Sequence, residues 1–142
     1  MIDTENRPYC IIDILPEQVP SDSPGRYFEV ERYFRSRLDE IIGRFALFLN
    51  RLNCYCELEV SLDCDTFTGD FAPEDLERFL RETGASPCPL YIRVNHTDAL
   101  FAYAGDEHYL TLYEPDPELI RLVSKLATSD GLFVWSTCYD IP

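Results

Sequence analysis

The chain has 142 residues, of which 46% are hydrophobic and 13% aromatic, and its net charge at pH 7 is −14. This length is typical of one compact domain, here residues 1–142, that buries about two thirds of its unfolded surface. The negative charge argues against binding to nucleic acid or anionic lipid, and no apolar run reaches the roughly 18 residues of a membrane span.

The first predicted strand is Tyr9–Leu15, an apolar segment that contains one acid, Asp13, which needs a partner or a sheet edge. After a proline-rich loop, Arg26–Leu52 repeats apolar residues every three or four positions, the period of one helix face. We expect one long helix that starts near Pro24, with Ser23 as its N-cap, and whose second half lies in the core. This helix holds six of the 12 basic residues against four acids, so its net charge is +2 and that of the rest of the chain is −16.

Alternation of side chains over residues 54–62 predicts a half-buried strand, and an acidic loop follows it. The loop lacks the spacing of a calcium-binding loop, so we expect solvated acids there rather than a metal site. The next segment, Pro73–Thr83, has an apolar stripe and acids in its first turn, which predicts a short helix. The acids of the loop are Asp63, Asp65 and Asp70.

Three short apolar segments joined by turns predict an antiparallel meander: Leu90–Asn95, Ala99–Ala104 and Tyr109–Glu114. We expect Leu90, Ile92, Val94, Leu100, Ala102, Ala104, Leu110 and Leu112 to face the helices. The opposite face then carries Tyr91, Arg93, Phe101, Tyr103, Tyr109, Thr111 and Tyr113, with Asp98, Asp106, Glu107 and Glu114 on its flanks. An aromatic patch rimmed by acids suits a partner that presents Lys and Arg, unless further helices cover this face.

The segment Glu114–Gly131 predicts a helix with Asp116 as N-cap and Pro117 at the first position. A last strand follows in Leu132–Tyr139, and we expect Trp135 in the core. Together the elements predict an α+β fold: a single domain of two layers, with a mixed or antiparallel sheet of about six strands. One long and two shorter helices cover it, in the order β-α-β-α-β-β-β-α-β, whereas the strand order does not follow from the sequence.

The amino terminus lacks the basic and apolar regions of a secretory signal, which predicts a cytoplasmic protein. Its cysteines are then expected to be mostly reduced and to pack as small hydrophobic residues. Three of them form only a weak zinc candidate, because their spacing is unusual and no fourth ligand is near, so we expect no metal and no cofactor. The six are Cys10, Cys54, Cys56, Cys64, Cys88 and Cys138, the zinc candidate being Cys54, Cys56 and Cys64.

Both histidines, His96 and His108, fall in predicted turns. The acids before His108 favour its protonated form, so it is the better candidate for a base or a ligand. No cysteine has a nucleophile signature around it, and glycine-rich phosphate loops are missing. We therefore expect no enzyme, the alternative being a small metal-dependent hydrolase that uses Asp63, Asp65, Asp70 and His108.

Charge and the aromatic patch favour a binding protein with a basic protein as its partner. The sequence leaves open whether this chain is a monomer or a dimer. In size, charge and lack of motifs the chain resembles toxin-immunity proteins as a class. The resemblance implies an inhibitor that masks a nuclease-like toxin, with carboxylates in the place of phosphates; a nucleic-acid mimic directed at a defence nuclease uses the same physics. The expected partner-binding residues are Asp63, Asp65, Asp70, Tyr91, Asp98, Tyr103, Asp106, Glu107, Tyr109 and Tyr113.

Overall fold

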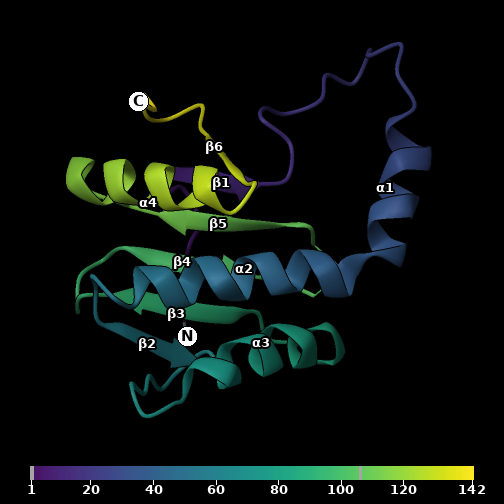
Figure 1. Ribbon diagram of the computed structural model, residues 1–142. Coiled ribbons are helices and arrows are strands. Elements are labelled where there is room, and N and C mark those ends of the chain that lie inside the picture. The colour runs from purple at the N-terminus through teal and green to yellow at the C-terminus, as the bar shows by residue number, and fades with distance from the viewer. Residues whose placement is uncertain (1, 106) are drawn as a thin grey trace.

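Six strands form one antiparallel sheet in the computed structural model, which describes residues 2–105 and 107–142 (Figure 1). The order across the sheet is β2-β3-β4-β5-β1-β6. The strands are β1 (Tyr9–Asp13), β2 (Leu58–Ser61), β3 (Leu90–Val94), β4 (Leu100–Tyr103), β5 (Tyr109–Tyr113) and β6 (Phe133–Trp135). The helices are α1 (Tyr27–Ser36), α2 (Leu38–Leu52), α3 (Pro73–Glu82) and α4 (Pro117–Ser129), with a 3-10 turn η1 (Thr83–Ala85) after α3.

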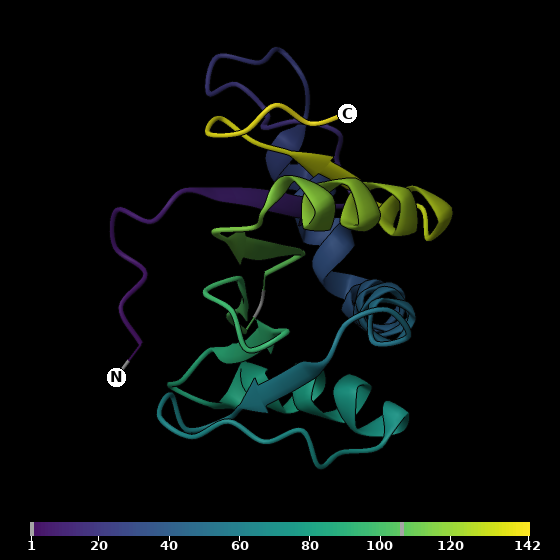
Figure 2. The same cartoon turned by 90° about the vertical axis from the view of Figure 1, so that its left-hand side faces the viewer.

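The α+β class and the order of elements along the chain are confirmed, and so is the meander of β3, β4 and β5. Strand β1 lies between β5 and β6, so the beginning and the end of the chain pair with each other in the sheet. Three helices, α2, α3 and α4, lie against one face of the sheet (Figure 2). Within the described part of the chain no helix covers the other face, which we call the helix-free face.

The long helix was predicted as one piece, but the structure divides it into α1 and α2. The break is at Arg37, whose φ of −113° and ψ of 23° are not helical. Neither Gly nor Pro marks this position, so the sequence gives no sign of the break. Helix α1 also starts at Tyr27 rather than near Pro24, and the Ser23 hydroxyl accepts a hydrogen bond from the Gly25 N–H instead of capping the helix.

The two halves differ in burial because only α2 lies over the sheet. Helix α1 projects beyond the end of the sheet (Figure 1), and no residue within Tyr27–Ser36 is buried. Phe28 on α1 is 80% exposed. Helix α2 fills the core, as its apolar second half predicted, with Ile41, Ile42, Phe45, Ala46, Phe48, Leu49 and Leu52.

Strand β4 faces the opposite way from our prediction. Phe101 and Tyr103 are fully buried beneath α2, with ring centroids 6.0 Å from Phe48 and 6.3 Å from Phe45, respectively. Phe101 lies opposite Ile92 and Leu112 in the ladders, and side chains that are directly opposite share a face. Both faces of this strand are apolar in sequence, so alternation alone could not choose between them, and the larger side chains take the core.

Cys64 and Cys88 form a disulfide, which the expectation of reduced cysteines missed. The bond removes Cys64 from any thiolate set with Cys54 and Cys56. Cys10 is a buried free thiol, as a packing residue should be, and burial raises its pKa to about 12. No helix in the described residues has an apolar stretch of membrane-spanning length.

Candidate functional site

The predicted partner-binding residues do not form one patch. Tyr103 belongs to the core, and Tyr91 is only 8% exposed on the helix-free face. Tyr109 and Tyr113, the first and last residues of β5, are half-buried on that face. Asp106 lies outside the described residues. Ladder register places the acids at two opposite ends of the sheet: Asp63 follows β2 at one end, and Asp98 lies in the β3–β4 turn at the other.

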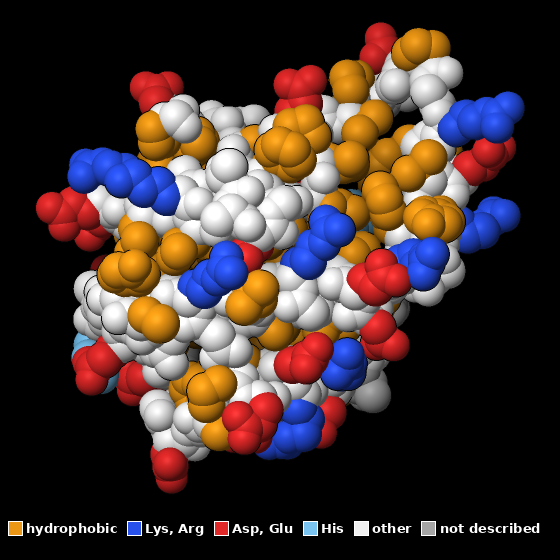
Figure 3. All heavy atoms as spheres, in the orientation of Figure 1, with side chains coloured by type: hydrophobic (Ala, Val, Ile, Leu, Met, Phe, Trp, Pro, Cys, Tyr) orange, Lys and Arg blue, Asp and Glu red, His pale blue; other side chains and the backbone are white. Residues whose placement is uncertain are grey.

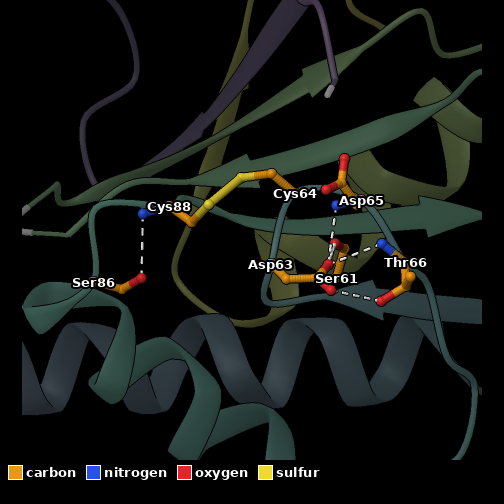
Figure 4. Close-up of a disulfide and its surroundings, with 7 residues drawn as sticks. All are labelled: Ser61, Asp63, Cys64, Asp65, Thr66, Ser86 and Cys88. Atoms are coloured by element: carbon orange, nitrogen blue, oxygen red, sulfur yellow. Dashed lines mark hydrogen bonds between the residues drawn. A yellow bond between two sulfur atoms is a disulfide. The ribbon is translucent and has the colours of Figure 1, made fainter.

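The acidic loop after β2 is organised around Asp63 (Figure 4). Its Oδ1 accepts hydrogen bonds from the N–H groups of Asp65 and Thr66 at 2.9 and 2.8 Å, and its Oδ2 accepts one from the Thr66 hydroxyl. These hydrogen bonds hold the pKa of Asp63 well below its usual range. The Cys64–Cys88 disulfide anchors the same loop to the chain before β3. Asp63 therefore acts in the structure as the support of a turn.

The loop acids do not converge with His108. From β2 to β5 there are three strand spacings, roughly 14 Å, and the two described loop carboxylates beyond Asp63, those of Asp65 and Asp70, are exposed on the β2 side. Within residues 2–105 and 107–142 no group of three or more His, Cys, Asp and Glu residues is arranged to hold a metal ion. Asp63, Asp65 and Asp70 therefore do not form a shared site with His108, as the hydrolase alternative requires.

Glu107 braces the turn between β4 and β5. Its carbonyl oxygen accepts a hydrogen bond from the Tyr103 hydroxyl at 2.9 Å, and its carboxylate accepts bonds from the Ala104 N–H and the Tyr109 hydroxyl, both at 3.3 Å. Burial raises the pKa of Glu107 despite these bonds. The side chain is thus engaged with its own turn rather than presented to a partner.

One hollow, which we call the carboxylate hollow, has a volume of about 470 Å³. It is formed where the α2–β2 loop, the β3–β4 turn and the start of α4 meet, at the left end of the sheet in Figure 1. Its apolar lining comes from Val94, Ala99, Leu119 and Leu122, and Tyr55, which is 69% exposed, adds an aromatic ring. Its acids are Asp98, Glu114, Asp116 and Glu118.

Among the described residues, Arg7 is the basic side chain that contacts this group of acids. Arg7 lies 3.4 Å from the Glu114 carboxylate and donates a 2.6 Å hydrogen bond to the Asp98 carbonyl oxygen, with its guanidinium over the Tyr113 ring. The Asp116 carboxylate accepts a hydrogen bond from the Leu119 N–H, which makes Asp116 the N-cap of α4, as predicted. Arg7–Glu114 is the single ion pair that these acids make within the described residues. An apolar lining beneath unpaired acids suits an alkyl stem with a cationic head.

A second hollow of about 430 Å³, which we call the tyrosine hollow, lies at the β1–β5–β6 side of the helix-free face. The loop after β1 and the first residue of α1 complete it. It contains Trp135, which is half-buried here and not in the core as predicted. Its lining is Tyr9, Ile11, Asp13, Leu15, Glu17, Gln18, Val19, Tyr27, His108, Tyr109 and Trp135.

His108 and Asp13 form a buried pair in the tyrosine hollow. The His108 Nδ1 lies 3.4 Å from the Asp13 Oδ1, and its Nε2 lies 4.0 Å from Glu31 on α1. The hydrogen bond to Asp13 raises the pKa of His108, opposed by burial and aided by the charges of Asp13 and Glu31. We expected the acids just before His108 to act on it, and the structure adds a hydrogen bond to the distant Asp13. In the sequence, this pair was indicated only by the position of Asp13 within the apolar segment Tyr9–Leu15, where an acid needs a partner.

No protein-family model, no curated protein and no solved structure matches this chain.

Proposed function

We propose that this is a non-enzymatic acidic protein that inhibits a basic partner by receiving one of its cationic side chains in the carboxylate hollow. The observation that carries the proposal is the hollow's composition, with four acids above an apolar lining and one ion pair, Arg7–Glu114, among them. A Lys or Arg side chain would place its alkyl stem on Leu119 and Leu122 and its charge beside Asp98 and Glu118.

The helix-covered side is less suited to this role because several of its charges pair with each other. Figure 3 shows basic and acidic side chains beside each other over α1, α2 and α3. The ion pairs there include Arg37–Glu40 at the start of α2, and Arg78–Asp75 and Arg81–Glu77 within α3. The unpaired acids of the carboxylate hollow, by contrast, are free to attract a cationic protein over a distance of about one Debye length.

The concrete form of the proposal is an immunity protein that neutralises a nuclease-like toxin. A surface that binds nucleic acid is basic, and acids placed against it occupy the positions of phosphates and block substrate. Steering by a net charge of −14 would speed the encounter, and burial of the exposed Tyr55 would add contact area at the edge of the hollow. A nucleic-acid mimic directed at a defence nuclease would use the same hollow.

Co-expression with candidate basic toxins from the native host tests the proposal. Rescue of growth by the wild-type protein, and loss of rescue in the Asp98→Asn/Glu118→Gln double variant, is the expected result. Tight binding to a toxin whose nuclease activity is undiminished would contradict the inhibitor. The matched control is Asp70→Asn/Glu74→Gln, which makes the same charge change at exposed acids outside the hollow, with Glu74 also in the first turn of a helix.

A further inference from the structure

We propose that the tyrosine hollow is a second and separate site, and that it binds an alkylguanidinium group, the group of an arginine side chain. Its lining differs from that of the carboxylate hollow, because four aromatic side chains surround one buried acid. Asp13, the acid, is only 5% exposed. The aromatic side chains are Tyr9, Tyr27, Tyr109 and Trp135.

Asp13 has bonding capacity left over despite its burial. Its Oδ1 accepts a 2.7 Å hydrogen bond from the Ile14 N–H, which is of ordinary strength. Its remaining contacts are long: 3.4 Å from the His108 Nδ1 to Oδ1, and 3.4 Å from the Trp135 Nε1 to Oδ2. A buried carboxylate normally has close donors, so the weakly bonded Oδ2 beside a hollow indicates a place for a donor from outside.

The charges around the hollow disfavour an anionic ligand. Asp13 and Glu17 line it, and Glu31 lies 4.0 Å from His108. Within the described residues, the basic groups in contact with these acids are His108 itself and Arg35, which lies 3.6 Å from Glu31. Glu107, which accepts a hydrogen bond from the Tyr109 hydroxyl, is a fourth acid beside the hollow. These carboxylates outnumber the two basic groups, so the site favours a cation.

Among cations, guanidinium fits this lining best. It is planar, weakly hydrated and stacks on aromatic faces, and it donates parallel hydrogen bonds to a carboxylate. The aromatic side chains also stay neutral: burial raises the pKa of Tyr109 to about 12, so its hydroxyl remains a phenol. An ammonium group is compact and strongly hydrated, so it would stack less well on the aromatic rings and could not donate two parallel hydrogen bonds to the Asp13 carboxylate.

The hollow contains its own reporter. Trp135 is the chain's single tryptophan, and it lines the site. Titration of the intact protein with Nα-acetyl-arginine amide, followed by tryptophan fluorescence, therefore measures occupancy without any protein partner. Nα-acetyl-citrulline amide, a neutral analogue of the same shape, is the matched control ligand. Because the probe is small, failure here is distinguishable from failure of the proposed inhibition.

We expect a saturable change in emission with the arginine probe and at least about tenfold weaker binding of the citrulline probe. Asp13→Asn and Tyr27→Leu should each weaken arginine binding by about tenfold, whereas Asp98→Asn in the other hollow should leave it unchanged. Tyr27 is at the start of α1 and outside the core, so its variant stays informative if Asp13→Asn fails to fold. Equal responses to the two probes, no saturation, or equal loss in Asp98→Asn would overturn the proposal.

Discussion

The Asp13 carboxylate lies 3.4 Å from the His108 imidazole, although 95 residues separate the two along the chain. The contact exists because β1 pairs with β5, which places Asp13 opposite Tyr109 at the end of the ladder. Glu31 then approaches the other ring nitrogen from α1, at 4.0 Å. This buried histidine thus connects the sheet with the helix that projects from its end, and its protonation should affect the stability of the fold.

The first prediction concerns pH. The pKa of His108 is raised in the folded protein, so its contribution is complete below the unfolded value near pH 6.5 and is lost as pH rises through the folded value. Each tenfold increase in proton affinity contributes about 1.4 kcal/mol. Urea unfolding of wild type and His108→Asn between about pH 6 and pH 9 measures the difference. A difference in unfolding free energy that stays constant or grows with rising pH would contradict the role of the Asp13 contact.

The second prediction concerns the core beneath α2. Phe48 is fully buried against Phe101, so Phe48→Ala should lower the free energy of unfolding by about 3–5 kcal/mol. The neighbouring Leu47, which is 47% exposed, provides the control, and Leu47→Ala should cost below about 1 kcal/mol. Chemical unfolding of both variants checks this, and similar losses would show that β4 does not place Phe101 beneath the helix.

The third prediction concerns the cysteines. Thiol counting on denatured protein, alkylated at once on cell lysis, should find four free thiols, since Cys64 and Cys88 are bonded to each other. Cys88→Ser should lower stability by about 3 kcal/mol, the value for closing a loop of this length, whereas exposed Cys54→Ser should have little effect. The count also tests the predicted location, because cytoplasmic thiols are kept reduced. Six free thiols in a protein with an unchanged fold would contradict the Cys64–Cys88 disulfide.

A fourth prediction concerns Asp130, whose side chain is only 2% exposed at the end of α4. Arg51 on α2 donates a 2.6 Å hydrogen bond to the Asp130 Oδ1. The Asp130 Oδ2 has no hydrogen-bond partner within the described residues. Arg51→Met should cost about 1–3 kcal/mol, less than the loss for a fully buried pair, because the Arg51 side chain is 42% exposed. The exposed pair Arg37–Glu40 is the control, and Arg37→Met should change stability much less than Arg51→Met does. Equal effects in urea unfolding would contradict this difference.

The sequence predicted those features that depend on near neighbours. The N-cap at Asp116, the apolar spacing of α4 and the turns of the meander are local, and all three are present in the structure. The break at Arg37 and the orientation of β4 were missed, because they are decided by what the helix and the strand pack against.

The two hollows could not be predicted at all. The carboxylate hollow joins Tyr55 from the α2–β2 loop, Asp98 from the β3–β4 turn and Glu118 from the first turn of α4. The tyrosine hollow joins both ends of the chain. Both depend on the strand order, which periodicity does not contain. Asp98, Tyr109 and His108 were identified as candidates from charge and residue type, but the acids and rings that surround them were not.

The most direct test of the account is the affinity for the basic partner, recovered by salt-graded capture from the native host and then purified, measured by calorimetry. We predict that Asp98→Asn/Glu118→Gln weakens binding by at least about tenfold, that Asp70→Asn/Glu74→Gln changes it little, and that wild-type affinity falls as salt rises. Equal losses in the two double variants, or an affinity independent of salt, would contradict a partner held in the carboxylate hollow.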